Sequence, residues 1–225
     1  MLQEIQKKPL GEIETVDFRG NVYDTFLYCL PKIQIKGLSY FEVIACEYRE
    51  DFKANTILWT ETSLEKPIEH IGLLGSHLLQ RSNFLLDFPH SQLIFCNDLE
   101  LLKKKGLVSR KSFQIPLKMI RKAFYLEMET DLGKKVFLLD TGFPISVLHD
   151  GLIKGSECML DIPVFSSYLI AHKKKLGPIS FYNFPLDPLF QCDGILGVSF
   201  FEENILYFNF QEKVVHLFCV NESIY

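Results

Sequence analysis

The chain has 225 residues, of which 48% are hydrophobic, and its formal net charge is −4. This length and composition can bury one large core or two smaller ones, which excludes wholesale disorder. Acidic and basic residues are interspersed, so the broad positive field that favours nucleic acid is absent and we expect no nucleic-acid partner. The 20 Phe and 9 Tyr residues favour strands over helices.

The six cysteines predict a reducing compartment. None forms a CxxC pair, and several lie in apolar runs such as LIFCN at 93–97, so we interpret them as small buried hydrophobes. The N-terminal residues lack an apolar core of signal-peptide length, and no stretch approaches the ~20 apolar residues that span a bilayer. We therefore expect a cytoplasmic protein without membrane contact.

Short apolar runs bounded by Gly, Pro and Asn predict strands along most of the chain. In chain order these runs are 23–30, 32–46, 84–88, 92–95, 123–129, 135–140, 178–184, 205–210 and 214–218. Helical patterns are few and brief, at 2–8, 76–81, 97–106 and 199–204. The sequence therefore predicts an all-β protein with few short helices.

The most polar and basic region begins at residue 97 and includes three consecutive lysines before Gly106, a pattern typical of a helix end followed by a connector. We place the domain boundary there. The predicted organisation is an N-terminal lobe over 1–96, a connector over 97–119 and a C-terminal lobe over 120–225.

An internal repeat supports two related lobes. Residues 71–95 align without gaps to residues 193–217 when shifted by 122 positions, because Gly72 then meets Gly194 (194 − 72). Both copies read apolar-apolar-Gly, a short helix, a strand, a turn and a last strand. The identical pairs are Gly72/Gly194, Leu74/Leu196, Gly75/Gly197 and Phe88/Phe210.

In the predicted C-terminal lobe, a carboxylate residue lies at the end of an apolar strand. The stretch VFLLDTGFPISVL runs from Val136 to Leu148 and contains Asp140 directly after four apolar residues. A buried Asp is costly unless it is hydrogen-bonded, paired or used in chemistry. An ordinary strand-ending turn is the simpler interpretation, since Asp and Gly are common in turns.

This motif resembles one lobe of an aspartic peptidase, with the retropepsin-like and pepsin-like groups matching best. The resemblance rests on a strand ending in Asp-Thr-Gly, on Ser and Val six and seven positions after the Asp, and on an apolar-apolar-Gly segment about 50 residues later. It implies a two-lobe, acid-protease-like β-barrel architecture with pseudo-twofold symmetry. It assigns catalysis to Asp140 and supporting roles to Thr141, Gly142, Ser146, Ile195, Leu196 and Gly197.

The resemblance also implies a reaction. Two carboxylates about 3 Å apart cannot both ionise, so one holds a proton as acid while the other activates a water that attacks a peptide carbonyl. The substrate would be a peptide or unfolded protein. In the family the Thr hydroxyl bonds across to the other lobe, a role that falls to Thr141 here. No cofactor is implied.

Two features depart from the family pattern. Phe143 follows the motif where a small or hydroxyl-bearing residue is usual. The N-terminal lobe has no Asp-Thr-Gly or Asp-Ser-Gly, and the 122 shift puts Phe18 opposite Asp140 (140 − 122). Asp17 and Asp24 are imperfect candidates for the second carboxylate.

Other chemistry has little support in the sequence. The six histidines fall in no HExxH or i, i+4 pair, and no serine lies in GxSxG. We therefore expect no metal site.

Three functions remain open. The first is an aspartic-type endopeptidase that obtains its second Asp from a segment missing at the start of the sequence, or from another chain. The second is a noncatalytic peptide-binding protein with the same fold, and the third is a structural lobe pair without a ligand. We expect a monomer rather than a homodimer, and we expect hydrogen bonds from Thr141, Gly142 and Gly197 to keep Asp140 ionised.

Overall fold

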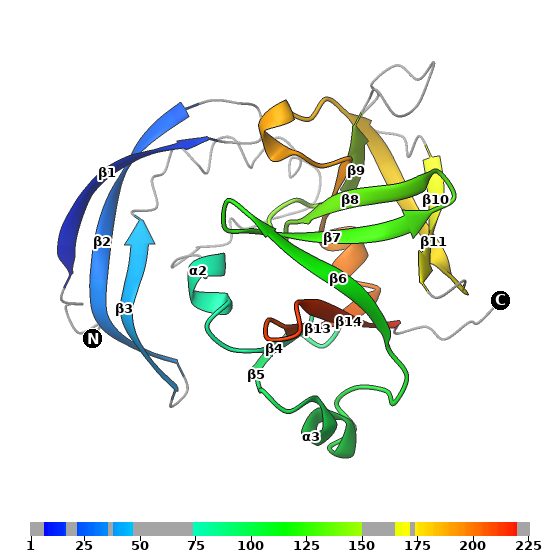
Figure 1. Cartoon of the computed structure of the whole chain (residues 1–225), viewed down its shortest axis with the longest axis horizontal. Helices are drawn as coiled ribbons and strands as arrows, with labels where there is room; N and C mark the ends of the chain where they lie inside the picture. Colours follow the sequence, from blue (N-terminus) through cyan, green and yellow to red (C-terminus); the bar gives the residue numbers. More distant parts are fainter. Residues whose placement is uncertain are drawn as a thin grey trace, which may run out of the picture. The chain divides into compact units, whose positions relative to one another are not determined.

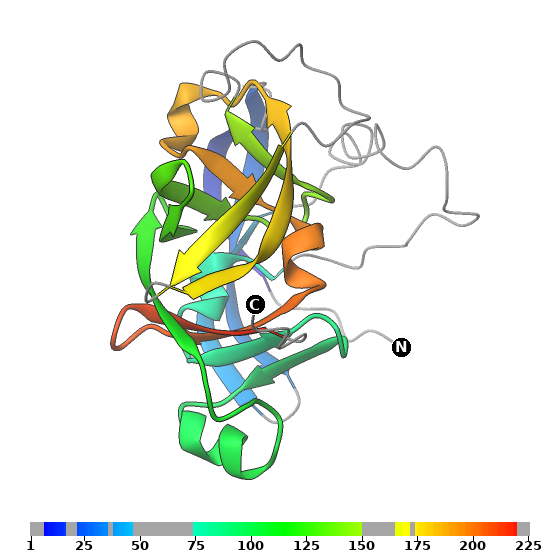
Figure 2. The same cartoon turned by 90° about the vertical axis from the view of Figure 1, so that its right-hand side faces the viewer.

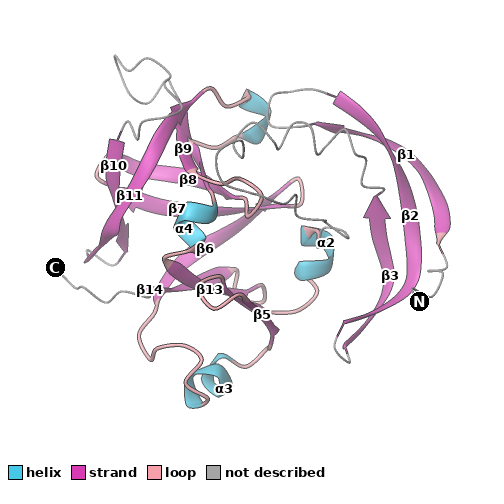
Figure 3. Ribbon diagram, turned by 180° about the vertical axis from the view of Figure 1, so that it is seen from behind, coloured by secondary structure: helices cyan, strands magenta, loops and turns pink. Residues whose placement is uncertain are grey.

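The structure is a computed structural model that describes residues 7–16, 22–35, 38–46, 74–149, 165–171 and 174–219. The chain divides into two compact units, Met1–Leu78 and Leu79–Tyr225. Strands dominate both units and the helices are short (Figure 3). No helix in the described ranges is long and apolar enough to cross a membrane.

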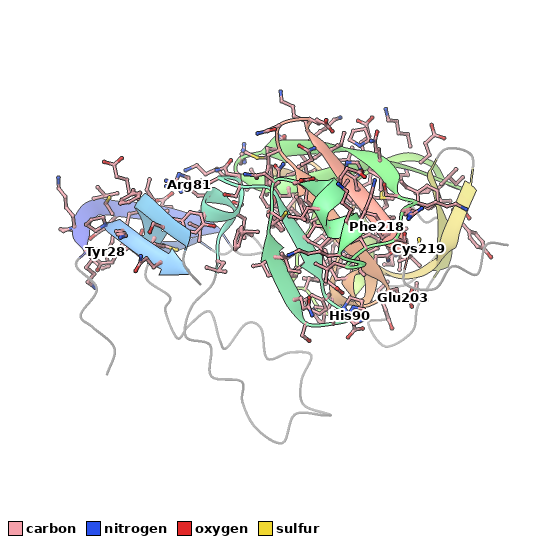
Figure 4. All side chains as sticks on the ribbon, turned by 90° about the horizontal axis from the view of Figure 1, so that it is seen from below. Tyr28, Arg81, His90, Glu203, Phe218 and Cys219 are labelled. Atoms are coloured by element: carbon pink, nitrogen blue, oxygen red, sulfur yellow. The ribbon has the colours of Figure 1, made fainter. Side chains whose placement is uncertain are left out.

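The first unit contains an antiparallel three-stranded sheet in the order β1-β2-β3, drawn in blue in Figure 1. Its strands are β1 (Lys8–Val16), β2 (Val22–Ile35) and β3 (Leu38–Cys46). Tyr40 and Val43 of β3 form a small buried cluster with Leu78 of helix α2 (Ser76–Leu79). Lys7 Nζ lies 4.2 Å from the centre of the Tyr28 ring, which Figure 4 labels on β2.

The second unit contains a sheet of 11 strands in the order β10-β11-β9-β12-β8-β7-β6-β14-β13-β4-β5. These strands are β4 (Phe84–Asp87), β5 (Gln92–Phe95), β6 (Phe113–Ile120), β7 (Ala123–Thr130), β8 (Gly133–Leu139), β9 (Ser146–His149), β10 (Phe165–Ala171), β11 (Lys174–Phe184), β12 (Gly194–Leu196), β13 (Asn204–Asn209) and β14 (Val214–Cys219). The helices are α3 (Leu99–Lys104), α4 (Val198–Phe201) and the 3-10 turn η3 (Pro188–Phe190).

Six of these strands close into a barrel, because β10 pairs with β7 as well as with β11. The long β10–β11 hairpin of this barrel is drawn in yellow in Figure 2. The remaining strands extend from β6 as a run of antiparallel pairs that ends at β5.

One large apolar cluster joins the barrel to this extension. It combines phenylalanines of both parts, including Phe84, Phe124, Phe137 and Phe208, each at most 8% exposed. Phe84 stacks on Phe208 with ring centres 4.4 Å apart. Phe218, labelled in Figure 4, belongs to a second cluster beneath α3. The aromatic content noted in the sequence is therefore used mainly to fill the core.

The predicted repeat is confirmed in three-dimensional detail. Helices α2 and α4 begin 122 positions apart (198 − 76) and have the same length. In the hairpins, Phe84 pairs with Phe95 and Leu206 pairs with Leu217, which is the same register shifted by 122 (206 − 84 and 217 − 95).

The two copies of this hairpin also pair with each other about a local twofold axis. Leu85 of β4 lies opposite Tyr207 of β13, and these residues are themselves 122 positions apart (207 − 85). Strands β4 and β13 are antiparallel. A twofold axis that passes between Leu85 and Tyr207 therefore maps each of these two strands onto the other, which is its repeat partner. The pseudo-twofold symmetry expected from the sequence is present in the sheet.

The compact units differ from the predicted lobes. We placed a connector at 97–119, whereas the units meet at residues 78 and 79. The reason is that β4, within the predicted N-terminal lobe, pairs with β13 across the local axis, and β5 pairs with β4. Part of the predicted connector is also regular structure, since α3 is capped by Asp98 and β6 begins at Phe113.

Leu85 is wholly buried at the local axis, so truncating it should leave a cavity where the two copies meet. We expect Leu85→Ala to lower the free energy of unfolding by about 2–5 kcal/mol, measured by denaturant titration. Leu93→Ala on the neighbouring strand β5, where the side chain is 38% exposed, is the matched control and should cost under about 1 kcal/mol. Equal losses in the two variants would contradict the packing at the axis.

Candidate functional site

Asp140 directly follows β8, at the start of a loop that leads to β9. Strand β12 lies between β8 and β9, parallel to β8 and antiparallel to β9. The loop therefore connects two strands that are not neighbours and passes over the end of the strand between them. This crossing positions Asp140 at the end of a buried three-strand layer.

Backbone hydrogen bonds fasten the Asp140 loop to the chain after β12. The Asp140 N–H donates to the Leu196 carbonyl at 3.1 Å, and the Val198 N–H donates to the Phe143 carbonyl at 2.7 Å. The Ser199 N–H donates to the Pro144 carbonyl at 3.2 Å. Because these bonds link segments about 55 residues apart (198 − 143), the loop and the start of α4 form one rigid unit.

Gly197 lies so close to this loop that no side chain can fit. A β-carbon on Gly197 would lie 2.0 Å from the Ile145 carbonyl oxygen and 2.4 Å from that of Phe143. Gly194 is similarly restricted, since its β-carbon would lie 2.4 Å from the Val147 carbonyl oxygen. The glycines of GILG are thus required by close backbone approach rather than by an unusual φ.

Ser146, the first residue of β9, also contacts Gly197. Its hydroxyl is fully buried and accepts a hydrogen bond from the Gly197 N–H at 3.2 Å. The Ser146 and Ser199 hydroxyl oxygens lie 3.2 Å apart. Ile195 and Leu196 are buried in β12, so the structure brings the predicted residues Ser146, Ile195, Leu196 and Gly197 together beneath the Asp140 loop.

The Asp140 carboxylate is partly buried and accepts a hydrogen bond from the Gly142 N–H at 2.8 Å. Burial raises the pKa of Asp140 above its ordinary value of 3.8, and the Gly142 bond lowers the pKa by a smaller amount. Gly142, one of the three expected donors, therefore does donate to the carboxylate. Gly197, one of the expected donors, gives its N–H to Ser146 instead.

The other predicted site residues are less well placed. Thr141 and Gly142 are exposed at the tip of the loop. Asp24 is exposed in β2, opposite Glu14 of β1, so it lies inside a regular hairpin rather than at a strand end. Asp17 lies outside the described residues. Within those residues, the carboxylate of Asp140 contacts no second carboxylate.

Two residues contribute to the site in ways that the sequence did not reveal. Phe143, interpreted as a departure from the family pattern, is 5% exposed and packs edge-on against Phe184 with ring centres 6.0 Å apart. The second is Asp193, whose side chain accepts from the Val136 N–H at 2.8 Å and whose carbonyl accepts from the His149 N–H at 2.8 Å. Asp193 thereby joins β8 and β9 at the start of β12, and its place directly before GILG was the available signal.

In the part of the chain that the structure describes, no three His, Cys, Asp or Glu side chains gather as a metal site. None of the described cysteines, at 29, 46, 96, 192 and 219, forms a disulfide bond. Burial raises the pKa of the Cys192 thiol to about 11, so this thiol is unreactive at neutral pH.

No protein-family model and no curated protein sequence matches this chain. Solved structures do resemble it. An aspartic proteinase from Irpex lacteus matches with a TM-score of 0.57 at 8% identity, covering 95% of this chain and 82% of the proteinase. Conglutin gamma, a basic 7S globulin from lupine seeds, matches with a TM-score of 0.57 at 12% identity, covering 92% and 72%. Basic 7S globulin from soybean matches with a TM-score of 0.55 at 12% identity, covering 92% and 71%.

These similarities and the strand topology define the fold as the all-β acid-protease fold, as the sequence predicted. At 8–12% identity they establish the fold alone. One of the three similar proteins is named a proteinase and two are named globulins, so the fold does not decide the function.

Because Gly197 lies so close to the Asp140 loop, a single methyl group added at position 197 should have a large effect on stability. We expect Gly197→Ala to lower the free energy of unfolding by about 3 kcal/mol or more, because the loop carbonyls would have to move. Its repeat partner is the matched control: a β-carbon on Gly75 would meet no described residue within 4 Å, so Gly75→Ala should cost under about 1 kcal/mol. Comparable losses in denaturant titrations would refute the close contact.

The raised pKa of Asp140 predicts a pH-dependent stability. The folded state binds the Asp140 proton more tightly than the unfolded state, so this group favours folding below pH 3.8 and loses that contribution as pH rises through its folded-state pKa. Asp140→Asn removes the penalty of a buried charge. We expect the variant to gain stability relative to the natural chain between about pH 4 and about pH 7, and a constant difference across that range would contradict the raised pKa.

Proposed function

We propose that this protein is an aspartic-type endopeptidase in which Asp140 is one of two catalytic carboxylates. The observation that carries the proposal is the position of Asp140, partly buried in a loop held by backbone bonds to Leu196 and Val198. A turn that served only to end a strand would not need a buried carboxylate with a raised pKa. The substrate class is peptide or unfolded protein.

In this mechanism one carboxylate removes a proton from water, and the water oxygen attacks the peptide carbonyl carbon. The other carboxylic acid gives its proton to the amide nitrogen as the C–N bond breaks. Burial raises the pKa of Asp140, which favours the protonated form and suits it to the acid role. The second carboxylate would come from another part of the chain or from a second chain, as the resemblance to viral, retropepsin-like members of the group implies.

A noncatalytic peptide-binding protein is the second candidate. It is favoured by one observation: within the described ranges, the hydrogen-bond donor to the Asp140 carboxylate is a backbone N–H, and no second carboxylate shares the site. Location and partners also remain predictions here, namely a cytoplasmic monomer that contacts neither membrane nor nucleic acid.

Binding of a transition-state mimic separates the two candidates without requiring turnover. The probe is a peptide in which a hydroxyl-bearing tetrahedral carbon replaces the scissile carbonyl, compared with the same peptide carrying the ordinary amide. A peptidase should bind the mimic at least about tenfold more tightly, because the tetrahedral centre is recognised mainly in the transition state. Asp140→Ala should abolish this preference, and equal affinity for both peptides in the natural chain would favour the noncatalytic candidate.

Cleavage of unfolded casein provides the second readout. We expect residues 1–225 alone to cleave it very slowly between about pH 4 and about pH 7, because no second carboxylate accompanies Asp140 among the described residues. Any turnover should disappear in Asp140→Ala. Turnover that survives this substitution would show that the chemistry does not reside at Asp140.

A further inference from the structure

A second apolar cluster lies between helix α3 and the sheet extension. It contains Leu85 and Tyr207, the two residues at the local axis, together with Leu102 of α3 and Val108 of the loop that follows α3. This cluster is separate from the large one that joins the barrel to the extension. Residues 97–112, called the α3 segment below, therefore cover one face of the paired hairpins.

His216 is buried beneath this cover. It lies on β14 directly opposite Tyr207 of β13, and only 6% of its surface is exposed. The His216 and Tyr207 ring centres are 5.9 Å apart, and the His216 Nδ1 atom lies 3.2 Å from the hydroxyl oxygen of Ser112. Because Ser112 is the last residue of the α3 segment, this hydrogen bond joins the cover to β14.

The groups that contact His216 or pair with it in the sheet are uncharged. They are the Ser112 hydroxyl, the Tyr207 ring and, on the other side of β14, Gln114 of β6. A neutral imidazole can be buried among such groups, whereas a protonated one needs a negative charge beside it to offset its lost hydration. The surroundings of His216 therefore favour the neutral ring.

The α3 segment itself carries an excess of positive charge. It contains five basic and two acidic residues, which gives a net charge of +3 (5 − 2). Within the described ranges, the charged groups that act on His216 are Glu212, exposed in the β13–β14 turn, and Lys103 of α3. Lys103 also pairs with Glu100 at 2.8 Å. A proton on His216 would add a positive charge beneath a cover that is already positive.

Burial lowers the pKa of His216 below its ordinary value of 6.5, Glu212 raises this pKa by a smaller amount, and Lys103 lowers it again. The ring therefore binds a proton more readily when the α3 segment is away from it. Above pH 6.5 the ring is neutral in both states and the docked segment keeps its full stability. That stability is lost progressively as the pH falls below 6.5.

We infer that His216 is an acid sensor whose protonation releases the α3 segment and uncovers Leu85 and Tyr207 at the local axis. The release is local, because the segment packs through Leu102 and Val108 into the separate cluster and leaves the large cluster intact. The uncovered face is apolar, so acidification would give the protein a new hydrophobic surface. This inference does not depend on the proposed function.

Hydrogen exchange measured at two pH values tests the inference. The Leu102, Lys105 and Leu107 amides donate to carbonyls within the α3 segment, so their protection reports its docking. We expect this protection, corrected for the intrinsic pH dependence of exchange, to fall at least about fivefold between about pH 7.5 and about pH 5. His216→Phe should remove most of the fall. His90→Gln, at a histidine whose side chain is 62% exposed, is the control and should leave the fall unchanged.

Two further measurements keep the test decisive if His216→Phe folds poorly. An NMR titration of the natural chain follows the His216 ring directly, and its midpoint should lie below pH 6.5. Lys103→Met removes a positive charge from the cover and should make the fall in protection smaller.

Three results would overturn the inference. One is an unchanged fall in protection in a folded His216→Phe variant, and another is a His216 ring that titrates at or above pH 6.5. The third is equal exchange, at about pH 5, of the α3-segment amides and of the Leu126 and Phe137 amides in the paired strands β7 and β8. The whole unit would then unfold together, and the segment would not be released on its own.

Discussion

The approach of Gly197 to the Asp140 loop is the contact on which the second unit depends. Strand β12 can lie between β8 and β9 only if the connecting loop crosses over its end, and the crossing brings backbone against backbone. Carbonyls of Phe143 and Ile145 occupy the volume that any side chain at position 197 would need. The Asp140 carboxylate is held in a defined position because the backbone around it cannot shift.

A local twofold axis passes between Leu85 and Tyr207 and relates the two copies of the repeat hairpin. Hairpins β4–β5 and β13–β14 share one register and pair with each other, so the first copy contributes strands to the sheet that supports the second.

Much of this arrangement could be predicted from the sequence, because its signals are local. The offset of 122 residues was visible in four identical pairs and holds in the helices and hairpins. The apolar approach to Asp140 and the glycines at 194 and 197 correctly indicated a buried strand layer. The unit boundary was not predictable in this way, because the pairing of β4 with β13 joins residues about 120 positions apart. Two further features could not be predicted from the sequence. The direction of the Asp140 pKa shift depends on how much water the folded loop excludes. The hydrogen bond from the Val136 N–H to the Asp193 carboxylate depends on side-chain geometry.

Native-state hydrogen exchange of the amides on either side of the repeat tests this account most directly. The Asp140, Gly197 and Val198 amides are bonded to Leu196, Ser146 and Phe143, so they should exchange only through global unfolding. The Gly75 amide, the repeat partner of Gly197, should exchange orders of magnitude faster, because no described residue lies within 4 Å of a β-carbon placed at Gly75. Equal protection of Gly75 and Gly197 would contradict the claim that the close packing of the Asp140 loop holds Gly197 in place.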